Sequence, residues 1–190
     1  MLLDGSQNQN KIFNMENLQY PIGRFSYQPY DETQRRAHIE TIRNLPVQLR
    51  EAATMLSSAQ LEQPYRPGGW TARQVIHHVA DSHLNAYIRF KLILTEEKPV
   101  IKPYNEKAWA ELEDTRKTPL EASLQILEGV HERWTTLLES IQGEDWQRTG
   151  FHPEQHREIS LFEFLALYSW HSRHHLEHVE LVLRTKAGPA

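Results

Sequence analysis

Apolar residues recur at intervals of three or four along most of this chain, which is the spacing that places side chains on one face of an α-helix. The pattern is interrupted only by segments that contain proline or glycine. Four long helices are therefore predicted, and together they indicate an all-α four-helix bundle as the simplest architecture. The predicted helices span residues 31–56, 71–95, 119–141 and 160–186.

The predicted helix ends carry the residues that usually cap helices. Asp31, Thr71 and Ser160 stand at N-cap positions, and a glutamate three residues after Ser160 completes the pattern of a capping box. Pro119 falls in the first turn of the third helix, where proline is tolerated. Pro46 lies inside the first helix and is expected to kink or break it, because proline has no N–H to donate.

The segments between the helices differ in length. Residues 96–118 form a long connection between the second and third helices, with a short helix expected at Asn105–Leu112. Such a connection can join helices that are not antiparallel neighbours. Residues 142–159 read as a loop with a small hairpin, and residues 15–30 read as an extended aromatic arm that lies on the body of the protein.

The beginning of the chain differs from the rest in composition. Residues 1–14 are polar and resemble vector-derived sequence, so we expect them to lie outside the fold. Residues 15–190 then form a single domain, because no linker or repeat divides them.

The composition excludes several classes of protein. Hydrophobic residues make up 39% and charged residues 24% of the chain, and the net charge is −4 without a cluster of basic residues, so we expect no nucleic-acid partner. No apolar stretch is long enough for a membrane span, so we expect no membrane partner either. Cysteine is absent, which excludes disulfides and thiolate ligands and is compatible with a cytoplasmic protein.

The last predicted helix contains four histidines within one short segment. His171 and His175 are four residues apart, so their rings stand one turn above each other and can bind one metal ion. His174 and His178 have the same spacing, and periodicity alone does not choose between the two pairs. Burying this many imidazoles requires hydrogen-bond partners or a cation, and we favour a metal.

A third ligand has to come from another helix. The second predicted helix has a polar stripe that lacks lysine and glutamate, which indicates that it lines a cavity and not solvent. Within this helix His77 and His78 are nearly equal candidates, whereas His83 falls on the apolar side and is expected in the core. The members of the polar stripe are Gln74, His78, Asp81, Ser82, Asn85 and Arg89.

Three blocks of the sequence resemble the DinB superfamily and, within it, the YfiT group of metal-dependent hydrolases. The blocks are GGWTARQVIHHVADSHLNAYIRFK, KPYNEKAW and LYSWHSRHH, in that order along the chain. The resemblance implies a DinB-like four-helix bundle that binds one divalent metal per chain, zinc or nickel, in a cytoplasmic homodimer. Carried over to this sequence, the family's ligands fall on His78, His171 and His175.

Three neutral imidazoles leave at least one metal position open, which is typical of a catalytic site. The resemblance implies transfer of a low-molecular-weight thiol, bacillithiol, to electrophiles. In this hypothesis Asp81 is the catalytic residue outside the ligand set, and Gln74, Ser82, Asn85 and Arg89 bind the substrate.

Two alternatives stay open at this point. The first is a metal-dependent hydrolase in which Asp81 acts as a base, although the pattern H-E-x-x-H is absent. The second is a non-enzymatic, metal-stabilised stress-response bundle, in which the protein would coordinate the metal fully. His152 is the candidate for a fourth ligand in that case.

Overall fold

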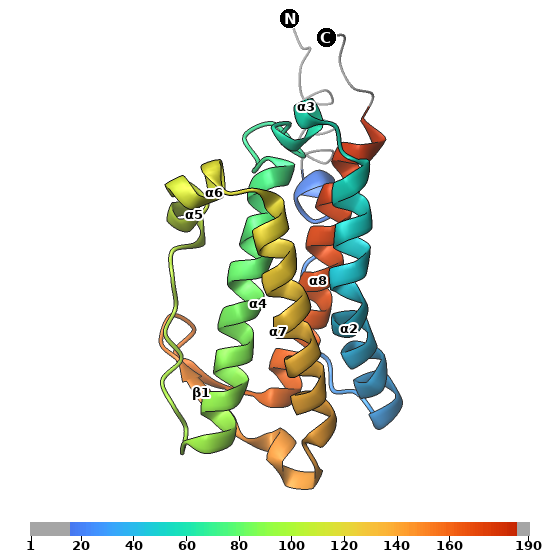
Figure 1. The fold of residues 1–190 in the computed structure, drawn as a ribbon. Helices are drawn as coiled ribbons and strands as arrows, with labels where there is room; N and C mark the ends of the chain where they lie inside the picture. Colours follow the sequence, from blue (N-terminus) through green and yellow to red (C-terminus); the bar gives the residue numbers. More distant parts are fainter. Residues whose placement is uncertain (1–15, 186–190) are drawn as a thin grey trace, which may run out of the picture.

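The computed structural model describes residues 16–185 and consists of four long helices with shorter elements at their ends (Figure 1). The predicted four-helix bundle is confirmed, and the predicted leader, residues 1–14, lies outside the described residues. The long helices are α2 (Glu32–Met55), α4 (Ala72–Thr95), α7 (Leu120–Ser140) and α8 (Leu161–Arg184).

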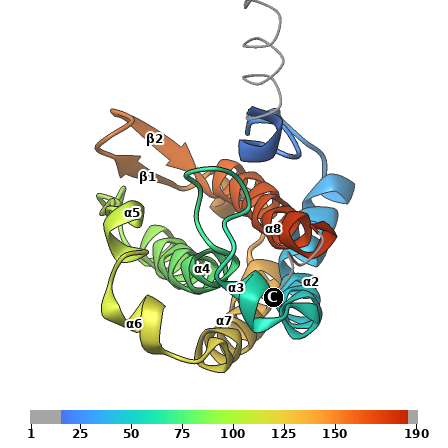
Figure 2. The ribbon, with the colours of Figure 1, turned by 90° about the horizontal axis from the view of Figure 1, so that it is seen from above.

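The helices are not connected as simple antiparallel neighbours. The colour gradient in Figure 1 shows that α2 and α8 run in one direction and that α4 and α7 run in the other. The packed pairs follow the order α2, α8, α4, α7 around the bundle, as the view from above shows (Figure 2). The pair α2 and α4 therefore lies on one diagonal, and the pair α7 and α8 lies on the other. Parallel packing of α4 against α7 is possible because the connection 96–118 returns the chain to the same end of the bundle.

The hydrophobic core is divided into two clusters by a layer of histidines. One cluster is built around Phe90, Trp134 and Phe164, and the other contains Leu49 and Val182. His83 on α4, His131 on α7 and the four histidines of α8 fall between the residues of the two clusters in sequence. A polar layer at this depth requires a partner for each ring nitrogen, because an unpaired polar group in the core is costly.

Helix α2 continues through Pro46, so of the two expected effects the break is wrong, and the kink stays a prediction. The proline ring is buried, and this burial offsets part of the roughly 3 kcal/mol that proline costs inside a helix. Asp31 and Thr71 both cap their helices as predicted. Ser160 accepts a hydrogen bond from the backbone N–H of Glu163, but the Glu163 carboxylate pairs with Arg157 and does not complete the capping box.

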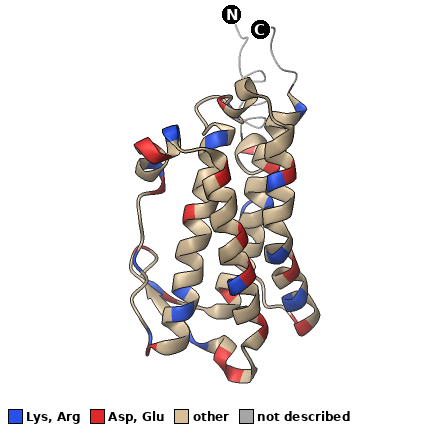
Figure 3. Cartoon of the chain, viewed as in Figure 1, with Lys and Arg blue, Asp and Glu red and all other residues tan. Residues whose placement is uncertain are grey.

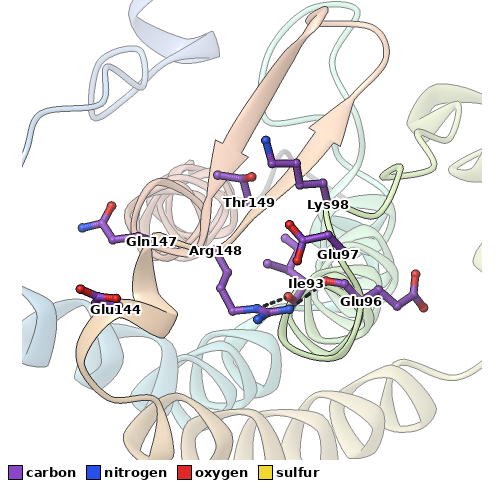
Figure 4. Close-up of a pocket in the computed structure, with 8 residues that line it drawn as sticks. All are labelled: Ile93, Glu96, Glu97, Lys98, Glu144, Gln147, Arg148 and Thr149. Atoms are coloured by element: carbon purple, nitrogen blue, oxygen red, sulfur yellow. Dashed lines mark hydrogen bonds between the residues drawn. The ribbon is translucent and has the colours of Figure 1, made fainter.

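The connection and the hairpin flank the bundle on one side. The connection 96–118 contains two short helices where one was expected. Backbone hydrogen bonds of Ile101 and Phe151 join this connection to the hairpin. At the far end of α4, Arg148 donates to the carbonyls of Ile93 and Glu96 beside a small pocket (Figure 4). The shorter elements are α3 (Ser58–Leu61), α5 (Glu106–Trp109), α6 (Glu113–Lys117), a 3₁₀ helix (Gly143–Gln147), and the antiparallel strands β1 (Thr149–His152) and β2 (Arg157–Ser160).

The aromatic arm before α2 lies on the body of the protein, as predicted. Residues 16–19 are helical, and the segment after them follows α8. The Trp170 indole N–H donates to the carbonyl of Gly23, and the Tyr30 hydroxyl donates to the carbonyl of Phe162. The chain's own last helix therefore covers this arm.

Acidic and basic residues are interspersed along the helices, as Figure 3 shows for one side. None of the helices within residues 16–185 combines the length and the apolar character that crossing a bilayer requires.

Candidate metal centre

Three histidines from two antiparallel helices converge between α4 and α8. The ring centroids of His171 and His175, one turn apart on α8, are 4.3 Å from each other. The centroid of the His78 ring, from α4, lies 4.8 Å from that of His175 and 5.4 Å from that of His171. One nitrogen of each ring lies within 4.8 Å of one nitrogen of the other two. The structure thus brings together the three residues that the family resemblance points to.

The environment keeps these rings neutral. Burial lowers the pKa of His78 to about 4, and the charge of a protonated His174 would lower it further. Burial and the neighbouring imidazoles lower the pKa of His171 and of His175 well below the ordinary value. Each ring therefore has one N–H and one lone pair at neutral pH, which is the form in which histidine binds a metal.

The hydrogen bonding fits a cation between the three rings. Among residues 16–185, no hydrogen bond joins His78, His171 and His175 to one another, although their nitrogens converge. Lone pairs that face each other without a donor repel, and a positive ion removes this repulsion. Imidazole nitrogens bind zinc at about 2.0–2.1 Å, so three nitrogens that lie within 4.8 Å of one another are near the spacing that one shared ion requires.

The two adjacent histidines of α4 face different neighbours. The Nδ1 atom of His77 lies 2.7 Å from the Ser123 hydroxyl on α7, so this ring points away from α8. His78 points toward α8 and packs against the indole of Trp70, with 4.7 Å between the ring centroids. Periodicity leaves His77 and His78 as nearly equal candidates, and they differ in the helix that each ring faces. Only His78 lies beside His171 and His175.

Two further histidines connect His171 to the core of the bundle. The Nδ1 atom of His171 lies 3.0 Å from Nε2 of His83, and Nδ1 of His83 lies 2.8 Å from Nε2 of His131. The Nδ1 atom of His131 lies 2.6 Å from the backbone oxygen of Ile42 on α2. Burial lowers the pKa of His131 to about 4 and holds the pKa of His83 well below its ordinary value, so both are neutral.

A second histidine group lies next to the first on α8. It consists of His174, His175 and His178, so His175 belongs to both groups. The Nδ1 atoms of His175 and His178 are 3.3 Å apart, and Nε2 of His178 lies 3.2 Å from the backbone oxygen of Gln19 in the arm. The His178 ring also stacks on Tyr65, with 3.8 Å between centroids.

No member of the polar stripe on α4 is fully exposed, and Gln74 lines a pocket, whereas the position of the whole stripe at a cavity stays a prediction. Ser82 is closest to the three histidines, with its hydroxyl 3.4 Å from Nε2 of His171. Asp81 is half-buried and faces α6. Burial raises the pKa of its carboxyl to about 6, and the nearby Asp114 adds to this effect. The catalytic role of Asp81 stays a prediction.

The other three residues of the stripe already have structural partners. Gln74 completes the capping box of α4 and donates to the carbonyl of Ala110, whereas Asn85 donates to the backbone of its own helix. Arg89 donates to the Tyr168 hydroxyl and to the carbonyl of Lys102. Substrate binding by these three residues also stays a prediction, and it would require a change of partner.

Within residues 16–185, the group of His78, His171 and His175 has no fourth histidine, cysteine or carboxylate. His152, the candidate for that position, lies on β1 outside the group. A metal held by these three residues would therefore keep positions for other ligands, as in catalytic sites.

A pocket of about 460 Å³ lies beside the histidines on the side of the loop before α4. Trp70, which packs on His78, and Tyr65, which stacks on His178, form part of its wall. Both basic and acidic residues line this pocket, so it suits a polar ligand. The residues that line it are Gln19, Tyr65, Arg66, Gly68, Gly69, Trp70, Gln74, Lys107 and Glu111.

Comparison with known proteins places this arrangement in a family. The family model of the DinB superfamily matches residues 41–179, a range that includes all three converging histidines. The chain belongs to the DinB superfamily.

Its relatives include a Bacillus cereus protein named "Putative metal-dependent hydrolase", which is 51% identical over 87% of this chain and 95% of its own length. YfiT of Bacillus subtilis is 46% identical over 86% of this chain and 92% of its own. A solved structure of B. subtilis YfiT, described as a probable metal-dependent hydrolase with an unusual four-helix bundle topology, superposes with a TM-score of 0.85. It is 44% identical and covers 88% of this chain and 97% of that one.

Sequence reasoning overlooked part of the site. The sequence does predict His83 in the core, but it gives His131 no role. His131 lies on the buried side of α7 between Leu127 and Trp134, and a histidine in that position is a signal for a buried polar contact. Trp70 and Tyr65 were not recognised either, because only the folded loop brings them onto the imidazoles.

Proposed function

We propose that this protein is a metal-dependent enzyme that transfers a low-molecular-weight thiol such as bacillithiol to electrophilic substrates. Zinc or nickel would be held by His78, His171 and His175. The observation that carries this proposal is the convergence of three neutral imidazoles that do not hydrogen-bond to one another and that, within residues 16–185, have no fourth histidine, cysteine or carboxylate beside them. A divalent metal bound there would supply a Lewis acid that keeps a thiol ionised at neutral pH.

The surroundings of the cluster favour transfer over hydrolysis. A hydrolase usually needs a carboxylate that takes a proton from water, and none lies in the histidine group within the described residues. The Ser82 hydroxyl lies beside His171 and can donate a hydrogen bond to an anionic group in the site. Arg66 and Lys107 line the adjacent pocket and offer partners for the carboxylates of a small thiol.

Hydrolysis is the second candidate, and two observations favour it. The relatives carry the name of a metal-dependent hydrolase. Moreover, a carboxyl whose pKa is raised to about 6, as in Asp81, is suited to exchanging protons near neutral pH. In this case Asp81 would act through a water molecule, because its carboxylate is not part of the histidine group.

Dependence on thiol separates the two reactions. Purified protein loaded with one metal ion is assayed with an epoxide or a halogenated electrophile at increasing thiol concentration. Transfer predicts turnover that requires the thiol, saturates with it and disappears in a His78→Ala variant, whereas His156→Asn on the exposed hairpin turn keeps it. Turnover of an ester or amide without thiol, lost when the metal is removed, would establish hydrolysis. A protein that binds the metal and catalyses neither reaction would be a metal-stabilised bundle.

We also propose that the protein is a cytoplasmic homodimer. The dimer rests on the resemblance to the family, and the aromatic arm gives it no support, because the arm packs on α8 of its own chain. Light scattering at micromolar concentration should give twice the mass of the chain, and the mass of a single chain would exclude the dimer.

A further inference from the structure

Pro46 leaves one carbonyl group of α2 without its helical N–H donor. In an α-helix the carbonyl of residue 42 accepts the N–H of residue 46, but proline has no N–H. The Ile42 oxygen instead lies 2.6 Å from Nδ1 of His131 on α7. A carbonyl oxygen only accepts hydrogen bonds, so Nδ1 of His131 must carry the hydrogen.

This assignment passes from ring to ring. A neutral imidazole with its hydrogen on Nδ1 has its lone pair on Nε2, so Nε2 of His131 accepts a hydrogen bond from Nδ1 of His83. By the same rule Nε2 of His83 accepts from Nδ1 of His171. The lone pair of His171 is then on Nε2. Any other pattern would bring two N–H groups or two lone pairs together in a buried layer.

A second series of hydrogen bonds runs from the Gln19 carbonyl through His178 to His175. The Gln19 carbonyl can only accept, so Nε2 of His178 carries a hydrogen and Nδ1 of His178 holds the lone pair. That atom lies 3.3 Å from Nδ1 of His175, which therefore donates to it. The lone pair of His175 is left on Nε2, the same atom as in His171.

We infer that two histidine relays, one ending on the Ile42 carbonyl and one on the Gln19 carbonyl, fix His171 and His175 as tautomers that present Nε2 to the metal. His83, His131 and His178 are positioning residues in this arrangement. The inference rests on the proposed metal site. In this arrangement the second histidine group on α8 is not a second metal site but supports His175, because both ring nitrogens of His178 already have hydrogen-bond partners.

The tautomers are measured directly in the metal-free wild-type protein. In protein labelled with nitrogen-15 histidine, long-range correlations between ring nitrogens and ring protons distinguish the two neutral tautomers. We expect hydrogen on Nδ1 of His83, His131, His171 and His175, and on Nε2 of His178. Hydrogen on Nε2 of His171 or of His175 would overturn the inference, whatever the protein's metal affinity.

Three variants then connect the relay to metal binding, with zinc affinity measured by competition with a chromophoric chelator. His131→Phe removes the donor to Ile42 and the acceptor for His83, and it should weaken zinc binding about 10- to 100-fold. His131→Gln keeps one donor and one acceptor and should recover most of the affinity. His77→Phe removes a buried histidine of α4 that is not part of either relay, and it should leave the affinity within about twofold of wild type.

The outcomes separate the relay from the proposed metal site. Wild-type protein that shows the expected tautomers but binds no zinc or nickel would refute the proposed function and leave the tautomers as assigned. Equal zinc affinity in wild type and in a folded His131→Phe variant would refute the positioning role. Two zinc ions per chain, with one lost in His178→Ala, would show a second metal site in place of the second relay.

Discussion

The pH dependence of stability offers a quantitative test of the buried histidine layer, and His131 is the residue for it. Its side chain is 2% exposed, and burial lowers its pKa from 6.5 to about 4. The unfolded chain therefore takes up a proton as the pH falls through 6.5, whereas the folded chain does so only near pH 4. The contribution of His131 to stability is fully present above pH 6.5 and is lost as the pH falls from 6.5 to about 4.

The size of the effect follows from the two pKa values. Each unit of pKa difference between the folded and the unfolded state corresponds to about 1.4 kcal/mol of unfolding free energy. By pH 4 the contribution of the neutral His131 ring to the free energy of unfolding has therefore fallen by roughly 3 kcal/mol. Over the interval from pH 7 to pH 5, the same linkage gives a loss of about 2 kcal/mol. This is a large part of the 5–15 kcal/mol that typically stabilises a domain.

The measurement is urea unfolding of metal-free protein at pH 7 and at pH 5, in wild type and in His131→Gln. Metal is removed because its binding depends on pH by itself. The variant should be less stable at pH 7, but it should lose about 2 kcal/mol less than wild type over this interval. His156→Asn, on the exposed hairpin turn, should change with pH as wild type does. Equal losses in wild type and His131→Gln would refute the reasoning.

Three other predictions concern the metal, the reaction and the core. His171→Ala should contain far less than one metal ion per chain by elemental analysis of protein purified without chelator, and unchanged metal content would contradict the assigned ligands. Asp81→Asn should keep most of the metal and lose activity in the assay that proves positive, because its carboxyl is not in the ligand group, whereas complete loss of metal would make Asp81 a ligand. Phe90→Ala removes a fully buried ring that contacts Trp134, so urea unfolding should show a loss of about 3–5 kcal/mol, and a loss below about 1 kcal/mol would mean that the core refills the cavity.

Much of the fold could be predicted because its signals are local. The caps at Asp31 and Thr71 and the proline before α7 fix helix ends to within a residue or two. Pro46 misled the prediction because the penalty of proline is local, whereas its compensation comes from packing and from a histidine on α7. The length of the connection 96–118 indicated only that the two helices it joins need not be antiparallel neighbours, and α4 and α7 do pack in parallel.

The site was predictable to a smaller extent. Spacing indicates that His171 and His175 belong together, but it does not separate them from His174 and His178 or choose His78 over His77. These choices depend on which helix packs beside each face, and that information is in the tertiary structure. The role of His131 was missed for the same reason, since its partners come from α2 and α4.

The contact between the arm and His178 would make the beginning of the described chain a thermodynamic partner of a metal bound at the proposed site. Gln19 accepts from His178, and His178 lies against His175, so an arm that leaves α8 removes the acceptor that holds this end of the relay. Binding free energies are reciprocal. The free energy that a docked arm would add to metal binding equals the free energy that the metal would add to docking of the arm. Amide exchange in residues 16–30 would therefore report on metal occupancy, although the arm and the metal would not touch each other.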